Sequence, residues 1–127
     1  AGNFENYKVT GALNKDLFAP CIKQILDGIK TDGKKRALFI LINYLGSSGY
    51  GMDEIKAMLL EWNKKNGQPL KEGYIQSQVS WHKRQKKSVL PPNCENAAYY
   101  RDIGVCLKDS FCRNIKNPVQ YKKRIRS

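Results

Sequence analysis

Four cysteines constrain what this chain of 127 residues can fold into more than any other feature. Cys94, Cys106 and Cys112 lie close together near the C-terminus, and Cys21 lies far upstream. Cysteines that meet from both ends of a chain can hold a metal that cross-links the fold, and ligation by thiolates alone suits an iron-sulfur cluster or zinc. The chain lacks the closely spaced cysteine pairs of zinc modules. The spacing alone favours an iron-sulfur cluster and zinc equally. Two disulfides or unligated buried cysteines are further alternatives.

The length is that of one small domain, in which a metal cross-link would supplement a modest core. We expect residues 1–18 to be a lead-in segment or linker, because their few apolar side chains follow no clear period. Residues 19–127 are then the domain.

Apolar residues at helical spacing predict a mostly α fold. The expected helices cover residues 20–30, 34–45, 53–66 and 74–87, and turn residues such as Gly46-Ser47-Ser48-Gly49 separate them. After Pro91-Pro92 the pattern changes to short pieces around the three later cysteines. The sequence therefore predicts helices followed by an irregular C-terminal lobe.

The strong positive charge points to a polyanionic partner. The formal net charge is +12 and the isoelectric point is about 9.7, and nucleic acid is the default partner for such a small domain. The chain shows no apolar run of transmembrane length, no signal peptide and no lipidation motif. We therefore expect no membrane partner and an intracellular protein, cytoplasmic or associated with the nucleoid.

The basic residues gather in three patches, at Lys34-Lys35-Arg36, at residues 83–87 and in the tail 122–126. Each could be an ordinary solvated face. Their coincidence in one domain favours nucleic acid, and nearby aromatic residues offer stacking surfaces for unpaired bases, among them Tyr74 and Trp81.

No catalytic centre is visible in the sequence. His82 is the only histidine and adjoins no nucleophile in a known motif, so we read it as a packing or phosphate-contact residue. There is no Asp-x-Asp pair for two-metal phosphoryl transfer and no P-loop. Any polymerising chemistry would come from another chain or domain.

Several motifs around the cysteines carry a family resemblance. They are Pro20-Cys21-Ile22, Met52-Asp53-Glu54-Ile55 leading to Trp62, Tyr74 with Gln78-Val79, Pro91-Pro92-Asn93-Cys94, Gly104-Val105-Cys106, and a final run from Cys112 to Tyr121 that follows the pattern Cys-x-x-Ile-Lys-Asn-Pro-x-x-Tyr. In these motifs, from about residue 19 to 123, the chain resembles the C-terminal iron-sulfur domain of the large subunit of archaeal and eukaryotic DNA primase.

The resemblance implies that Cys21, Cys94, Cys106 and Cys112 ligate a 4Fe-4S cluster that closes the helical domain, with zinc as the alternative. It also implies an accessory, non-catalytic role, in which the domain binds a single-stranded DNA template, the primer 5′ end and nucleoside triphosphates, while a catalytic primase subunit or domain makes the primer. The implied nucleic-acid and nucleotide contacts are Lys34, Lys35, Arg36, Tyr74, Gln78, Trp81, His82, Lys83 and Arg84.

The chain departs from the family at its anion-binding helix. Where members carry His-x-x-Arg, this chain has Asp32-Gly33-Lys34-Lys35-Arg36, so either Lys35 or Arg36 could take the place of the arginine, and the histidine is missing. Trp81 occupies a position that is often histidine. These departures suggest a divergent member of archaeal or mobile-element origin.

Two other readings compete with an accessory primase domain. The first is a metal-stabilised protein-interaction module with a basic surface, which predicts no affinity for nucleic acid. The second is an independent cluster-bearing nuclease or glycosylase, for which the sequence marks no catalytic carboxylate or lysine.

Overall fold

The computed structural model describes residues 14–30, 32–85, 90–106, 112 and 115–121. The elements in chain order are η1 (Lys15–Leu17), α2 (Pro20–Leu26), α3 (Lys34–Ser47), α4 (Met52–Asn63), α5 (Glu72–Lys83) and η3 (Pro118–Gln120). No strand occurs within those residues, so the prediction of a mostly α fold is confirmed. The basic residues 86–87 and the tail 122–126 lie outside the described part.

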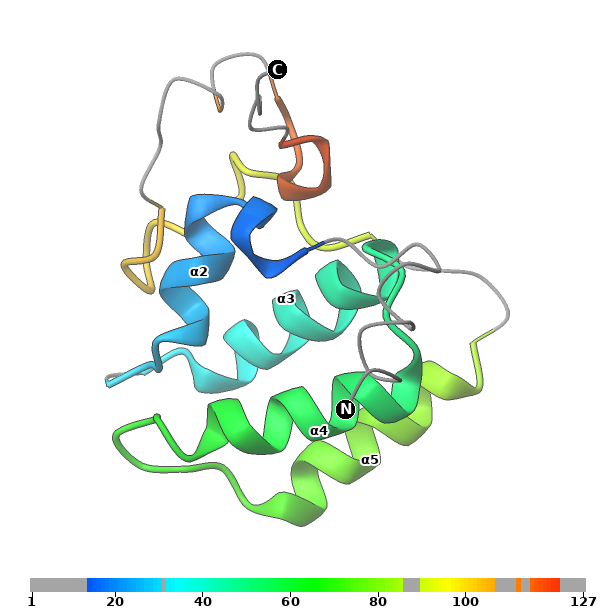
Figure 1. The fold of residues 1–127 in the computed structure, drawn as a ribbon. Coiled ribbons are helices and arrows are strands. Elements are labelled where there is room, and N and C mark those ends of the chain that lie inside the picture. Colours follow the sequence, from blue (N-terminus) through cyan, green and yellow to red (C-terminus); the bar gives the residue numbers. More distant parts are fainter. Residues whose placement is uncertain (1–13, 31, 86–89, 107–111, 113–114, 122–127) are drawn as a thin grey trace.

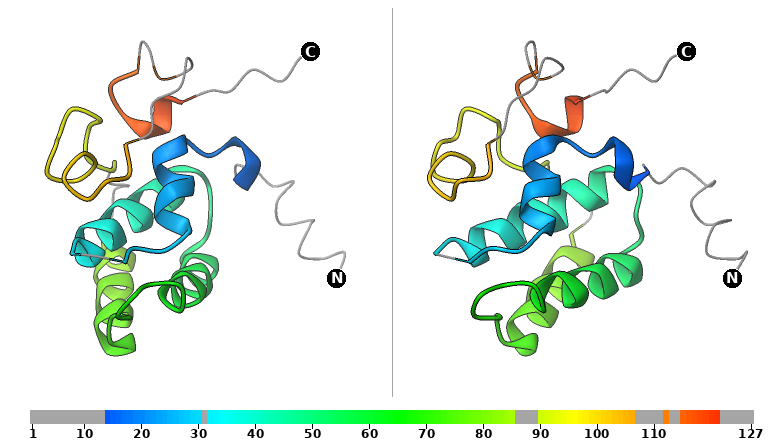
Figure 2. Two further views of the ribbon diagram at one scale, coloured as in Figure 1. Left: turned by 90° about the vertical axis from the view of Figure 1, so that its left-hand side faces the viewer. Right: turned by 60° about the vertical axis from the view of Figure 1, so that its left-hand side comes forward.

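Helix α3 runs through the middle of the domain (Figure 1). It is apolar on nearly every side after Arg36, and its buried residues include Leu38, Ile40, Leu41 and Leu45. A helix that is apolar all round must be covered on several sides. Helices α4 and α5 lie on one side of α3, and α2 lies on the other, as Figure 2 also shows.

Helix α2 is shorter than predicted. It ends at Leu26, because Gly28 adopts a positive φ of 107° and its Cα packs against the backbone of Lys65, where a Cβ would clash with the carbonyl. Ile29 remains buried, yet it is not helical: its N–H donates to the Oδ1 of Asn66 at 2.7 Å. The prediction was wrong here because the burial of Ile29 mimicked helical spacing.

Helices α4 and α5 both end earlier than the sequence predicts, at Asn63 and at Lys83. The first turn of α4 holds Asp53 and Glu54, and the Gly51 N–H donates to Glu54 Oε1 at 3.1 Å, which satisfies one donor of the helix terminus. None of the described helices combines the length and apolar character needed to cross a bilayer.

The described residues from 90 to 121 form turns and one short 3-10 helix, as expected for an irregular lobe. This C-terminal lobe lies next to α2, on the side of α3 away from α4 (Figure 1).

Phe18, just before α2, belongs to the hydrophobic core of the helices. It is buried and makes edge-to-face contacts with Tyr44 and Tyr50, with distances between ring centroids of 5.4 and 6.1 Å.

Candidate metal centre and nucleic-acid interface

Cys21 is positioned by the start of α2. Ala19 precedes the helix in an extended conformation, and Pro20 occupies the first helical position, where its missing N–H costs nothing. The Ala19 N–H donates to the buried Tyr44 hydroxyl at 3.2 Å, and Ile22 anchors the next position in the core. Cys21 therefore stands in a well-held first turn.

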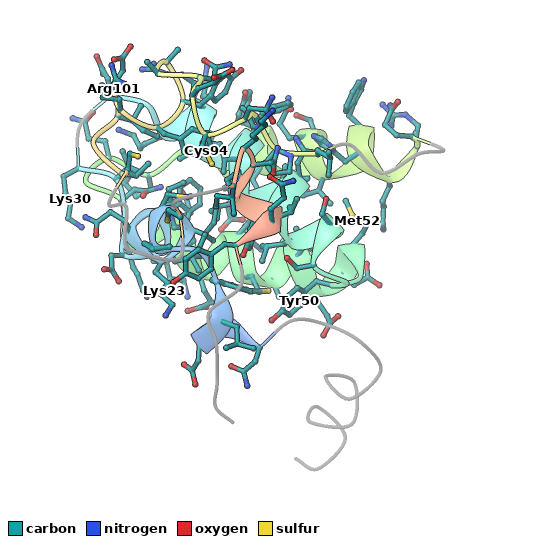
Figure 3. All side chains as sticks on the ribbon, turned by 90° about the horizontal axis from the view of Figure 1, so that it is seen from above. Lys23, Lys30, Tyr50, Met52, Cys94 and Arg101 are labelled. Atoms are coloured by element: carbon teal, nitrogen blue, oxygen red, sulfur yellow. The ribbon has the colours of Figure 1, made fainter. Side chains whose placement is uncertain are left out.

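Cys94 is held by the end of the C-terminal lobe. Its N–H donates to the Lys116 carbonyl at 2.7 Å, and Figure 3 shows Cys94 beside the segment that carries η3. The buried Asn117 fastens the same two segments: its Nδ2 donates to the Pro91 carbonyl at 2.7 Å and to Asn93 Oδ1 at 3.1 Å. Two segments more than twenty residues apart are thus bonded at the cysteine.

The four cysteines line one cavity of about 240 Å³. Its wall is completed by Ala19, Tyr100, Ile115 and Pro118, and by Glu95 and Lys116. The Tyr100 hydroxyl donates to the Pro92 carbonyl at 2.6 Å, which fixes the turn that leads into Cys94. Thiols from α2 and from three points of the C-terminal lobe therefore face a common, largely apolar space.

None of the four cysteines forms a disulfide, so the alternative of two disulfides is wrong. The pKa of the Cys21 thiol is raised to about 12, first by burial and then by the charges of Cys94, Cys106 and Cys112. Thiolates gathered in one place repel one another, and only a cation among them can keep them ionised together. The donor set fits a positively charged metal centre.

Zinc and an iron-sulfur cluster make different demands on the four thiols. Within the described part of the chain, no three His, Cys, Asp or Glu side chains form a group that could hold a metal ion. Tetrahedral zinc draws its thiolates to about 2.3 Å, which places the sulfur atoms only roughly 3.8 Å apart. The thiols share a cavity without that convergence, and ligation of a cluster or of zinc stays a prediction.

The predicted nucleic-acid residues of α3 and α5 meet at the start of both helices. The Lys35 ammonium lies over the ring of Tyr74, 4.8 Å from its centroid. Lys35 is exposed, and Lys34 and Tyr74 are half-buried. A cation held against an aromatic face has already lost part of its freedom, so a phosphate contact at this pair, which stays a prediction, would cost little further side-chain entropy.

Arg36 is directed elsewhere. It is half-buried, and its guanidinium donates to the Ala98 carbonyl at 2.7 Å, which ties the first turn of α3 to the C-terminal lobe. Gly33 precedes α3 with a positive φ of 112°, and a Cβ there would clash with Ile103 Cγ2. If Arg36 stood for the family's arginine, the histidine position would fall on Gly33, where the structure leaves no room for a side chain.

A row of rings connects the C-terminal lobe to α5. Phe39 lies 5.8 Å from Tyr99 and 6.2 Å from His82, and His82 lies 4.9 Å from Trp81. Among the described residues, Trp81 is one of the few large apolar side chains that are exposed, at 46%. Burial lowers the pKa of His82, so it is neutral at physiological pH.

The remaining predicted contacts lie along α5. Gln78 is half-buried, and Lys83 and Arg84 are exposed at the helix end. Lys83 pairs with Asp53 of α4 at 3.4 Å. Sequence reasoning missed Asn117 and Arg36 as the residues that brace the site; Asn117 lies within the Cys112–Tyr121 motif, but nothing in the motif marked its hydrogen bonds.

Comparison with known proteins identifies one family. A family model for the C-terminal domain of the large subunit of eukaryotic and archaeal DNA primase matches residues 11–126, which is nearly the whole chain. Neither a curated protein nor a solved structure matches the chain significantly.

Proposed function

Because the chain belongs to the family of the C-terminal domain of the eukaryotic and archaeal DNA primase large subunit, we propose that it supports primer initiation by binding single-stranded template together with the initiating nucleotide or the primer 5′-triphosphate. The large subunit of a primase is an accessory subunit, which works together with a catalytic primase subunit on nucleic acid. The observation that carries the proposal is the joining of two features in one fold: a four-thiol cavity and, braced against it, a basic and aromatic surface on α3 and α5.

The cofactor that suits the cavity is a 4Fe-4S cluster held by Cys21, Cys94, Cys106 and Cys112. Four thiols outside any disulfide line a single space of about 240 Å³, and the apolar wall, which includes Ala19, supplies the dry shell that such clusters need. When bound, the cluster supplies a cross-link between α2 and the C-terminal lobe.

Contacts within the protein connect the C-terminal lobe, which the cluster would hold, to the proposed nucleic-acid surface on α3 and α5. Arg36 bonds the C-terminal lobe to the first turn of α3, next to Lys35. Phe39 touches Tyr99 of the lobe on one side and His82 of α5 on the other. Loss of the lobe would therefore loosen both the anion contact and the row of rings.

Within this surface the contacts favour Lys35 over Arg36 as the phosphate ligand, because Lys35 is exposed and Arg36 is engaged by Ala98. A lysine binds phosphate as a point charge, without the two parallel bonds of a guanidinium. We expect weaker discrimination of the 5′-triphosphate than an arginine would give. Trp81 offers an exposed ring on which an unpaired base can stack.

Fluorescence anisotropy with labelled single-stranded DNA tests the proposed surface. Lys35→Ala should weaken binding and reduce the slope of log K against log salt by about 1, as expected for one lost phosphate contact. Lys64→Ala is the matched control, since Lys64 is an exposed lysine that pairs with Glu61 across one helical turn of α4 and is not among the predicted contacts. If both variants bind the DNA equally well, the binding site does not include Lys35. If the parent chain does not bind the DNA at moderate salt, a protein-interaction module is favoured instead.

Iron and acid-labile sulfide analysis of anaerobically purified protein tests the cofactor. We expect about four iron and four sulfide per chain and a brown protein. Stoichiometric zinc in a colourless protein would refute the cluster while leaving the nucleic-acid surface open to its own test.

A further inference from the structure

Asn66 and Gly67 form the one asparagine–glycine pair in the chain. They lie just after α4, and the segment that follows α2 packs against them, at the left of Figure 1. Asparagine is a thermolabile residue, and a following glycine makes deamidation easiest, because glycine has no side chain to keep its own nitrogen away from the asparagine amide. The pair is therefore a candidate site of spontaneous covalent modification.

The reaction needs only this dipeptide and water. The Gly67 nitrogen attacks the Asn66 Cγ and forms a succinimide ring, while the C–N bond of the side-chain amide breaks and ammonia leaves with the proton given up by Gly67. Water then opens the ring and returns a proton to the Gly67 nitrogen, which leaves aspartate or isoaspartate at position 66. Water is consumed and ammonia is released, and no oxidant, reductant or enzyme is required.

In the folded chain both reacting groups are held by the same residue. The Gly67 N–H donates to the Ile29 carbonyl at 3.0 Å, so the attacking nitrogen is engaged. The Asn66 side chain accepts from the Ile29 N–H at 2.7 Å and donates to Asn63 Oδ1 at 3.3 Å, and Asn66 is only 6% exposed. Separation of the segment after α2 from the end of α4 would therefore release the nitrogen and the amide together.

The two segments approach each other closely at this α2–α4 junction. A Cβ at Gly67 would lie 3.2 Å from the Lys30 carbonyl oxygen, and a Cβ at Gly28 would clash with the Lys65 carbonyl. The Lys30 ammonium also donates to the Lys65 carbonyl. Close packing explains why glycine stands at position 67, and the same packing keeps the reactive pair closed.

Deamidation would change the contacts of the junction. Asn63 is fixed by Leu70: its Oδ1 accepts from the Leu70 N–H at 2.8 Å, and its Nδ2 donates to the Leu70 carbonyl at 2.7 Å. The Asn63 amide cannot turn over without losing both bonds, so it continues to present an oxygen to residue 66. An aspartate at position 66 would set a charged oxygen against that oxygen in a buried place, where an unpaired charge is costly.

From these contacts we infer that Asn66 is a deamidation site that the fold keeps closed, and that opening of the α2–α4 junction converts it irreversibly to aspartate or isoaspartate. Helix α2 carries Cys21 to the thiol cavity. The modification would therefore weaken the attachment of a cysteine-bearing helix each time the junction has opened for long enough to react. The inference stands independently of the proposed nucleic-acid function.

Mass spectrometry of the tryptic peptide 66–71, released after Lys65 and Lys71, measures the modification. The full chain is incubated in mildly alkaline buffer with and without urea. We expect Asn66 to deamidate at least about tenfold faster in urea, because only the opened fraction of the folded chain can react. Asn96 is exposed but precedes alanine, so it serves as the internal reference and should change little in either condition.

Two variants loosen the junction by different bonds. Lys30→Ala removes the side-chain bond across it, and Asn63→Ala removes the partner of the Asn66 amide. Each should raise the rate in the folded chain severalfold. Asn43→Ala is the matched control and should keep the parent's rate, since Asn43 is also a buried asparagine but bonds within α3.

Four outcomes would overturn the inference. The first is an equal rate at Asn66 with and without urea, and the second is the absence of modification in urea. The third is the parent's rate in both Lys30→Ala and Asn63→Ala. The fourth concerns Asn66→Asp, which introduces the product directly and should lower the melting temperature; an unchanged melting temperature would show that the modification leaves the junction intact.

Discussion

The most informative perturbation is removal of the Asn117 side chain, because this one residue fastens both ends of the cysteine-bearing lobe. Its Nδ2 donates to the Pro91 carbonyl at 2.7 Å and to Asn93 Oδ1 at 3.1 Å, and its Oδ1 accepts from the Val119 N–H at 3.1 Å. The side chain is 5% exposed. Water cannot readily take its place at the buried Pro91 carbonyl.

The size of the effect follows from these bonds. Each net hydrogen bond contributes about 0.5–1.5 kcal/mol, and a buried carbonyl left without a donor costs about 1–3 kcal/mol. Asn93 is exposed and regains its bond from water. We therefore expect Asn117→Ala to lower the free energy of unfolding by about 2–4 kcal/mol, and to hasten loss of the metal centre, since the Cys94 N–H bonds to the neighbouring Lys116 carbonyl.

Urea unfolding followed by circular dichroism measures this difference, and a slope of about 2 kcal/mol per molar, in the middle of the usual range, converts it to a fall in midpoint of about 1–2 M. Asn96→Ala is the control, because Asn96 lies in the same lobe and is exposed. Visible absorbance under a chelator reports retention of the metal centre. If Asn117→Ala unfolds within about 0.5 kcal/mol of Asn96→Ala, less than one net hydrogen bond, the side chain does not brace the lobe and the reasoning fails.

Three further predictions test the fold around the site. Gly33→Ala should destabilise by at least about 1–2 kcal/mol, since Gly33 has φ 112° and its Cβ position is occupied, whereas Gly46→Ala, inside α3 with open space around it, should be neutral or stabilising in the same thermal melts. Trp62→Phe should cost about 1–3 kcal/mol in urea, because the indole N–H donates to the buried Ile25 carbonyl at 2.7 Å. Burial lowers the pKa of His82 from 6.5, so below that pH the unfolded chain takes up a proton that the folded chain resists; stability should fall more steeply from pH 6.5 downward in the parent than in His82→Gln, and parallel curves would contradict this.

Much of the site was accessible from residue types and their local order. The four cysteines and their flanking prolines and glycines predicted one metal centre, and the structure places all four around one cavity. Lys35 and Tyr74 were both predicted contacts, and they lie together. Periodicity located four helices but misjudged where each of them ends: α2, α4 and α5 end earlier than predicted, and α3 continues through Gly46 to Ser47. At α2 the reason is that Ile29 is buried without being helical, while Gly28 with its positive φ ends the helix.

The sequence by itself determined the chemistry that this protein has at its disposal: thiols for a metal centre, an excess of positive charge, aromatic rings near it, and helical segments that must bury one another. Only the tertiary structure decided how these groups are used. It assigned Arg36 to the C-terminal lobe, left Lys35 exposed, and made Asn117 the brace of the cysteine lobe. Side-chain type and spacing act locally, whereas a hydrogen bond or a shared cavity joins residues whose separation along the chain carries no signal.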